Sequence, residues 1–227
     1  MTTRLLGGAL ALLALLPATA QAAALTPLKP CYISVTQRSG DAPPVITQER
    51  LDLGGNGFTP NALVEVSFDG RLDRTIQADA AGNLPLQVLK SPYRERGEGP
   101  FTLTAAEQGN PINSVSLQSR TTALVLRVRP RAARPQRRVR FSGRGFTDQR
   151  AVWAHYLYDG KVRKTVRLVR RIENPCGRFS VRRKQIPIKR PKTGKWTLQV
   201  DQQRRYSRAP NSVFVRVTID VFRPRAR

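Results

Sequence analysis

The chain has 227 residues, of which 40% are hydrophobic and 24% are charged, and its 40 Lys and Arg outnumber 15 Asp and Glu to give a formal net charge of +25. This length is enough for about two domains of ordinary size and too short for a large multidomain enzyme. A single histidine and two cysteines argue against a metal centre built from a histidine cluster.

The N-terminal residues 1–22 are predicted to form a cleaved secretory signal peptide. A basic residue precedes the apolar run 5–16, and a proline and a tract of small residues follow it. The run is shorter than the roughly 20 residues of a membrane-spanning helix, and small residues at a cleavage site are typical of exported proteins. We expect cleavage between Ala22 and Ala23, a secreted protein without a transmembrane segment, and a short N-terminal segment over 23–30. An uncleaved N-terminal anchor is the alternative.

From residue 31 onward the apolar residues alternate with polar ones in short runs separated by Gly, Pro, Asp and Asn. This period and punctuation are typical of half-buried β-strands, and no amphipathic helix is predicted. The expected strands are 31–35, 48–53, 63–68, 72–77, 84–89, 101–106 and 114–119, followed by 124–129, 137–142, 151–158, 161–169, 178–185, 195–201 and 212–222.

The sequence repeats itself. Residues 51–59 match residues 139–147, and each copy is followed by an alternating strand that ends in Asp-Gly, at 69–70 and at 159–160. Asp-Gly between alternating runs predicts a hairpin with a type I′ turn. We therefore expect an all-β protein of two tandem immunoglobulin-like β-sandwich domains, each of about seven strands. The predicted domains are 31–122 and 124–222, with almost no linker between them and a basic tail at 223–227.

The element Gly55-Asn56-Gly57-Phe58-Thr59-Pro60 and its counterpart Gly143-Arg144-Gly145-Phe146-Thr147 resemble the G-x-G-F-x-P-G element of bacterial IPT/TIG-like immunoglobulin domains. In that family the element forms the turn between the second and third strands. The whole chain is similar to two-domain secreted proteins of high-GC Gram-positive bacteria. The resemblance implies an extracellular β-sandwich protein and supplies no catalytic chemistry.

We find no pattern that predicts catalysis, a cofactor or a metal. His155 lies in a predicted strand with no neighbouring signature of a nucleophile or an orienting carboxylate, so a structural role is favoured. The paired glycines Gly55-x-Gly57 and Gly143-x-Gly145 lead into a strand and not into the helix of a phosphate-binding loop. We predict a non-enzymatic protein without a cofactor or a metal site.

Cys31 and Cys176 fall one in each predicted domain. Because free thiols are uncommon in oxidising compartments, an interdomain disulfide is the favoured interpretation. Two buried free thiols and intermolecular pairing are the alternatives.

The positive charge belongs to the second domain. Residues 23–123 carry 9 Lys and Arg against 10 Asp and Glu, whereas residues 124–227 carry 30 against 5. Strand alternation predicts that the arginines of the second domain line its solvated faces. The alternative is a composition set by GC-rich codons, because 32 of the 40 basic residues are Arg. The candidate polyanion-binding residues are Arg138, Arg140, Arg163, Arg167, Arg182, Lys189, Arg190, Lys192 and Lys195.

Three functions follow as hypotheses. The favoured one is an interaction module that holds to an anionic polymer, such as a cell-wall polymer, a polysaccharide or a nucleic acid bound without sequence preference. The second is a carrier of a small ligand in a crevice between sheets or domains, which an aromatic cleft around Trp153, Tyr156 and Tyr158 would favour. The third is an enzyme with a site that the sequence does not reveal. The sequence leaves the oligomeric state open.

Overall fold

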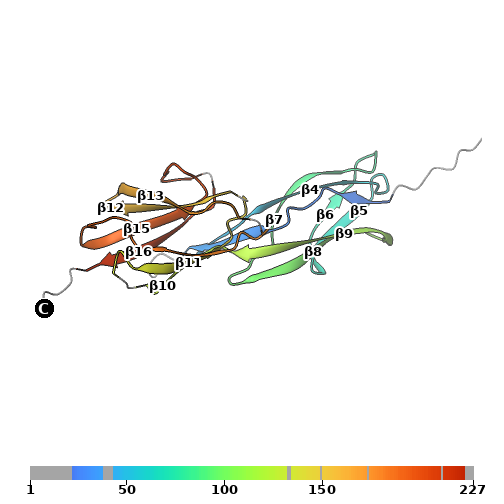
Figure 1. The fold of residues 1–227 in the computed structure, drawn as a ribbon. Helices are drawn as coiled ribbons and strands as arrows, with labels where there is room; N and C mark the ends of the chain where they lie inside the picture. Colours follow the sequence, from blue (N-terminus) through green and yellow to red (C-terminus); the bar gives the residue numbers. More distant parts are fainter. Residues whose placement is uncertain are drawn as a thin grey trace, which may run out of the picture.

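The computed structural model describes residues 22–37, 43–131, 134–148, 150–172, 174–210 and 212–222, and in these ranges every regular element is a β-strand. Two hydrophobic cores lie in two lobes arranged end to end (Figure 1), which we call the N-terminal lobe (22–123) and the C-terminal lobe (124–222). The all-β prediction is confirmed, and the stacked sheets are compatible with β-sandwiches. The signal peptide other than Ala22, and the basic tail 223–227, lie outside the described residues.

The N-terminal lobe stacks a three-stranded sheet on a six-stranded sheet. Side chains alternate between core and solvent, so that Leu51, Leu53, Val64 and Val66 are fully buried. The smaller sheet has the order β1 (Ala24–Leu25), β4 (Arg50–Asn56), β7 (Leu84–Lys90). The larger has the order β3 (Val45–Gln48), β2 (Tyr32–Gln37), β9 (Asn110–Ala123), β8 (Glu98–Glu107), β5 (Leu63–Phe68), β6 (Arg71–Gln77).

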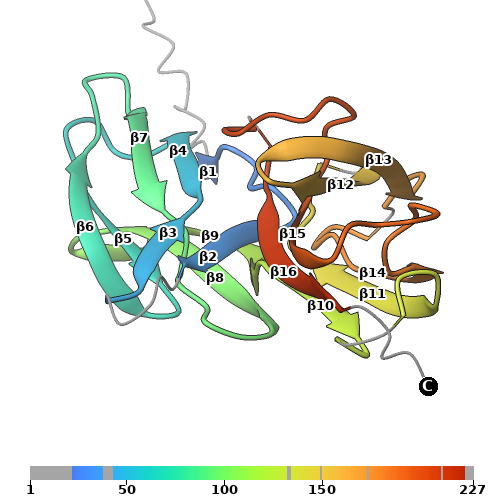
Figure 2. The same ribbon diagram turned by 90° about the vertical axis from the view of Figure 1, so that its left-hand side faces the viewer.

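The C-terminal lobe stacks a three-stranded sheet on a four-stranded sheet, as Figure 2 shows. Phe141, Tyr156 and Leu198 lie at the centre of its core. The smaller sheet has the order β10 (Val125–Arg129), β11 (Arg138–Arg144), β14 (Phe179–Lys184). The larger has the order β13 (Lys161–Val169), β12 (Val152–Tyr158), β15 (Gly194–Asp201), β16 (Val215–Val221).

The two lobes share one strand plan. The order β1-β4-β7 corresponds to β10-β11-β14, and β6-β5-β8-β9 corresponds to β13-β12-β15-β16. The strand expected at 31–35 is β2, which pairs in parallel with the end of β9. Among the described residues of the C-terminal lobe, no strand corresponds to β2. The counterpart of β10 is instead β1, two residues that pair with β4. Two residues are too few to show an alternating pattern, which is why the sequence did not predict β1.

The predicted hairpin turns are present in both lobes. Asp69 and Gly70 have φ values of 50° and 79°, and Asp159 and Gly160 have 51° and 67°. A type I′ turn requires a positive φ at both central positions, so the prediction of a hairpin turn at each Asp-Gly pair is confirmed.

None of the described residues forms a helix that could cross a membrane.

The glycine-phenylalanine element forms the same turn in each copy. Gly57 and Gly145 have φ values of 80° and 90°, and Phe58 and Phe146 are each buried in the core of their own lobe. A Cβ on Gly57 would lie 2.6 Å from the carbonyl oxygen of Ala22, so the chain entering β1 passes directly over this glycine. The same turn forms in the second copy, where Asp148 follows Thr147 in place of the Pro60 that follows Thr59.

Candidate anion-binding surface

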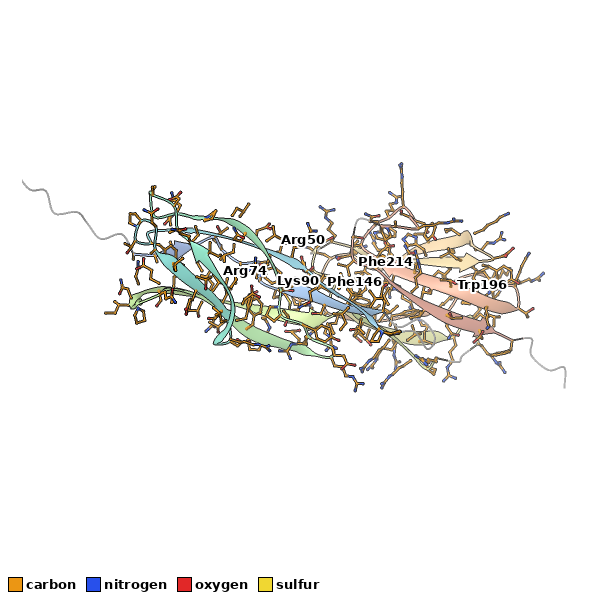
Figure 3. All side chains as sticks on the ribbon, turned by 180° about the vertical axis from the view of Figure 1, so that it is seen from behind. Arg50, Arg74, Lys90, Phe146, Trp196 and Phe214 are labelled. Atoms are coloured by element: carbon orange, nitrogen blue, oxygen red, sulfur yellow. A yellow bond between two sulfur atoms is a disulfide. The ribbon has the colours of Figure 1, made fainter. Side chains whose placement is uncertain are left out.

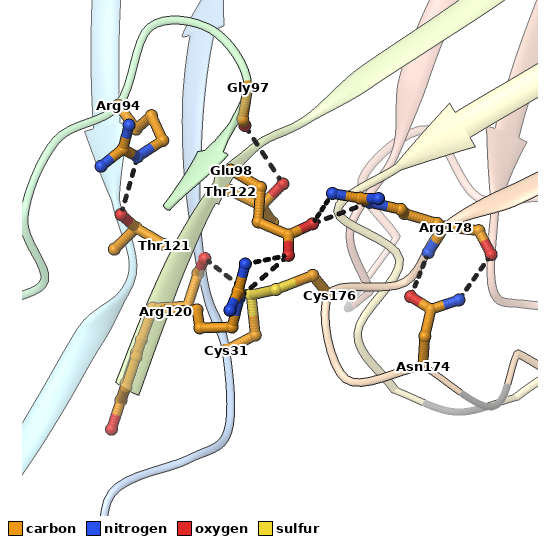
Figure 4. Close-up of polar contacts among 11 residues, drawn as sticks. Cys31, Arg94, Gly97, Glu98, Arg120, Thr121, Thr122, Asn174, Cys176 and Arg178 are labelled. Carbon is orange, nitrogen blue, oxygen red and sulfur yellow. Dashed lines mark hydrogen bonds and ion pairs between the residues drawn. A yellow bond between two sulfur atoms is a disulfide. The ribbon is translucent and has the colours of Figure 1, made fainter. Parts of the chain in front are cut away.

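A disulfide joins the two lobes. Cys31 precedes β2, and Cys176 lies in the turn before β14; their Cα atoms are 5.3 Å apart, and both residues are buried. The predicted Cys31–Cys176 pair is therefore confirmed. Figure 4 shows it beside the strands β8 and β9, where the lobes meet.

An ion-pair cluster lies next to the disulfide (Figure 4). The carboxylate of Glu98 is 2.9 Å from the guanidinium of Arg120 and 2.7 Å from that of Arg178 in the other lobe. Only 9% of the Glu98 side chain is exposed. Charge-assisted hydrogen bonds of this kind are shorter and stronger than neutral ones, so Glu98 holds one arginine from each side of the junction.

The outward side of the sheet β10-β11-β14 carries a cluster of positively charged side chains. Arg129, Arg140 and Arg182 are cross-strand neighbours in one row, and Arg138 is opposite Lys184 in the next. All are exposed, and the three strands contain no acidic residue. We call the set Arg127, Arg129, Arg138, Arg140, Arg182 and Lys184 the basic face.

The basic face contains three of the predicted residues, Arg138, Arg140 and Arg182, and three further cations, Arg127, Arg129 and Lys184. Arg127 and Arg129 alternate with the core residues Leu126 and Val128. Their outward direction could therefore have been predicted from the strand 124–129. The pairing of β10 with β11, which brings them beside Arg140, could not.

The remaining candidates lie elsewhere. Arg163, Arg190 and Lys192 line a hollow of about 240 Å³ beside Tyr158 and Trp196 at the far end of the C-terminal lobe. Arg167 lies over the ring of Trp153, with its Cζ atom 5.9 Å from the ring centroid. The candidates thus do not form one site. Lys189 and Lys195 are exposed and belong to the loop 185–193 and to β15, respectively.

His155 is fully buried in a polar network. Its Nδ1 lies 3.0 Å from Thr165 Oγ1, and its Nε2 lies 3.2 Å from Asp201 Oδ1 and 3.1 Å from the carbonyl oxygen of Gln203. Both partners of Nε2 are acceptors, so Nε2 donates. Because His155 and Asp201 are fully buried, a substrate has no access to the pair. The network instead fastens the loop after β15, whose Tyr206 packs edge-on against the imidazole.

Trp153, Tyr156 and Tyr158 do not form the aromatic cleft that would favour the carrier hypothesis. Tyr156 points into the core and is fully buried, and Tyr158 packs against Trp196 instead of Trp153. A different hollow of about 390 Å³ lies between the lobes, lined partly by Ile33, Val35, Leu124, Val213 and Phe214. Figure 3 shows Phe214 and Phe146 near the junction and Trp196 farther along the C-terminal lobe.

In the described ranges no three His, Cys, Asp or Glu residues lie close enough together to hold a metal ion.

Comparisons with known proteins give no family. No protein-family model and no curated protein matches this chain. A β-glucuronidase of Parabacteroides merdae shares 11% identity over 75% of this chain, with a TM-score of 0.25, and the chain spans only 22% of that enzyme. A tetra-tandem repeat from the extending region of a large adhesion protein shares 15% over 84% of this chain and 48% of its own, with a TM-score of 0.28. The CupB2 chaperone of Pseudomonas aeruginosa shares 10% over 77% of this chain and 94% of its own, with a TM-score of 0.23.

Proposed function

We propose that the protein is a secreted, non-enzymatic module of two immunoglobulin-like domains whose basic face holds it to anionic polymers at the cell surface or in the extracellular space. The basic face carries this proposal. Six exposed cations lie on one sheet surface that has no acidic residue in its strands.

The register of the sheet places like charges side by side on the basic face. Arg129 and Arg182 are both direct cross-strand neighbours of Arg140, and like charges directly opposite each other destabilise a sheet. A bound polyanion removes that repulsion and releases its own counterions, which is the main source of affinity for such polymers. Arginine also offers a planar fork that fits phosphate, sulfate and carboxylate groups. The basic face therefore lowers the stability of the free protein and favours binding of an anionic partner.

The test compares two quadruple variants of the full chain on a heparin column and a polyphosphate column across a salt series. The first replaces Arg129, Arg140, Arg182 and Lys184 of the basic face with Gln. The control replaces Arg163, Arg190, Lys192 and Lys195 at the far end with Gln, so that both lose the same formal charge. We expect the first variant to elute at much lower salt, with a salt slope reduced by about 3 to 4 for the four lost contacts. Equal loss in both variants would show that net charge alone governs retention.

The hollow between the lobes supports a second candidate function, the carriage of a small apolar ligand. Its apolar wall comes from Ile33 and Val35 of the N-terminal lobe and from Leu124, Val213 and Phe214 of the C-terminal lobe. A fluorescent apolar probe should bind the wild-type protein in a saturable manner and bind Phe214→Ser weakly. The control is Phe222→Ser, because Phe222 is 77% exposed and outside this hollow. Equal probe binding by both variants would exclude the carrier function.

A further inference from the structure

A groove of about 570 Å³ lies at the end of the basic face nearest the junction. Its lining includes Val125, Arg127, Ser142, Arg144, Arg178 and Ser180. Three of these six residues are arginines, and two carry hydroxyl groups. The groove is therefore a recess with cationic walls and small neutral donors.

Arg144 is the residue of this groove that the fold leaves uncompensated. Its Nε is buried and has no hydrogen-bond partner, and within the described residues the side chain makes no ion pair. A buried donor without a partner destabilises the folded protein, and more strongly when the group is charged. A structural role for Arg144 would require a partner that the described residues do not supply.

The neighbouring charges increase this cost. Burial lowers the pKa of Arg144, and the positive charges of Arg178 and Arg127 lower the pKa further, against a smaller opposing effect of Glu98. Glu98 is already bound to Arg120 and Arg178. The four arginines and one carboxylate leave an excess of three positive charges around the recess.

Two serines complete the recess. Ser142 is the cross-strand neighbour of Ser180 on one side and of Arg127 on the other. Cross-strand neighbours point to the same side of a sheet, so both hydroxyls face outward beside the arginine side chains. Hydroxyl donors next to guanidinium groups suit an anion that has several acceptor oxygens.

We propose that this groove is a discrete site for one tetrahedral dianion, a phosphate monoester group, bound by Arg127, Arg144 and Arg178 with Ser142 and Ser180. The inference deepens the proposed function, because it assigns the chemical group of the polymer that is held at a defined position. The remainder of the basic face adds affinity without adding selectivity.

The test is a calorimetric titration of the full chain with inorganic phosphate and with sulfate at constant ionic strength. We expect saturable binding of one anion per chain. Arg144→Gln should weaken the affinity at least tenfold, and Arg127→Gln should weaken it several-fold as an independent variant. Arg163→Gln should leave the affinity within twofold, because Arg163 lines the separate hollow beside Tyr158 and Trp196 and lies outside the groove. Without anion, Arg144→Gln should be as stable as the wild type or more stable, which separates an anion site from a structural role.

Dimethyl phosphate serves as the probe for a phosphodiester, and its single charge should reduce the affinity at least tenfold relative to inorganic phosphate. Equal heats for chloride, or undiminished phosphate binding by Arg144→Gln, would overturn the inference. The heparin measurement is independent. Retention that depends on the basic face without phosphate binding would reject this site alone, and phosphate binding without such retention would reject the proposed function alone.

Discussion

The two lobes share one strand order but carry different side chains on the outward side of their three-stranded sheets. In the N-terminal lobe, Asp52 of β4 lies opposite Val88 of β7, whereas in the C-terminal lobe Arg140 of β11 lies opposite Arg182 of β14. Val88 is half exposed, so the N-terminal sheet tolerates an acid and an apolar residue on its outward side. The fold therefore does not require arginine at these positions. The basic face has to be explained by something other than stability.

The covalent link between the lobes provides the largest expected effect. Replacing both Cys31 and Cys176 with Ser removes a cross-link between residues 145 positions apart, which contributes about 5 kcal/mol in the chain-entropy model. We expect one joint thermal transition to separate into two, the first of them at a lower temperature. Differential scanning calorimetry of the variant and of the reduced wild type measures this. An unchanged single transition would mean that packing alone couples the lobes.

The buried residues Phe58 and Phe146 provide a matched pair of substitutions, one in each lobe. Phe58→Ala and Phe146→Ala each remove a buried ring from one core, at an expected cost of about 3–5 kcal/mol. The variant without the disulfide is the background of choice, because each loss should then appear in one transition only. Destabilisation of both transitions by either substitution would show that the lobes unfold as one unit.

Low pH should destabilise the N-terminal lobe in particular, because that lobe contains the carboxylate of Glu107. Burial raises the pKa of Glu107, but four donors from Thr59, Asn110 and Asn113 outweigh burial and hold its pKa below the ordinary value of 4.5. A lowered folded-state pKa means that the contribution is complete above the ordinary pKa and is lost as the pH falls through the folded value. The stability of the N-terminal lobe should therefore fall below about pH 4.5.

The C-terminal lobe provides the control for this acid effect. There the backbone N–H of Asp148 donates to the neutral amide of Gln202, an arrangement that does not titrate. Denaturant midpoints between pH 3 and 6 should show the loss in the wild type and a smaller pH dependence in Glu107→Gln. The same pH dependence in both proteins would assign the acid effect to other carboxylates.

The smallest expected effect concerns the basic face itself. Arg140→Thr removes the central cation of the row that contains Arg129 and Arg182, and relief of cross-strand repulsion should raise stability by up to about 1 kcal/mol at low salt. The gain should disappear at high salt because screening removes the repulsion. The midpoint of urea unfolding at two salt concentrations measures it. Loss of stability would indicate that Arg140 supports the sheet.

Local features of the sequence predicted much of the fold. Alternation identified the seven expected strands of each lobe, and the two Asp-Gly pairs identified the hairpins with their positive φ values. One cysteine in each half of a chain that we expect to be exported was enough to indicate the disulfide. Each of these signals depends on neighbouring residues or on a small number of alternatives.

The features that the sequence did not predict depend on pairing between distant segments. The ion pairs of Glu98 join β8 to β9 and to the turn before β14, and no local pattern predicts them. Arg144 belonged to a glycine-rich turn in the sequence, and only the pairing of β11 with β10 and β14 places it beside Arg127 and Ser180. Alternation gives the direction of a side chain, whereas register gives its neighbours.

The disulfide also determines how the protein responds to a pulling force. If the described part of the chain is held at residues 22 and 222, tension passes from Cys31 directly to Cys176 through the sulfur atoms. The 145-residue interval between them, about 500 Å of extended chain, then bears no tension while the bond is intact. Most of the N-terminal lobe is therefore protected from mechanical unfolding, and a force extends only the short segment before Cys31 and the strands that follow Cys176.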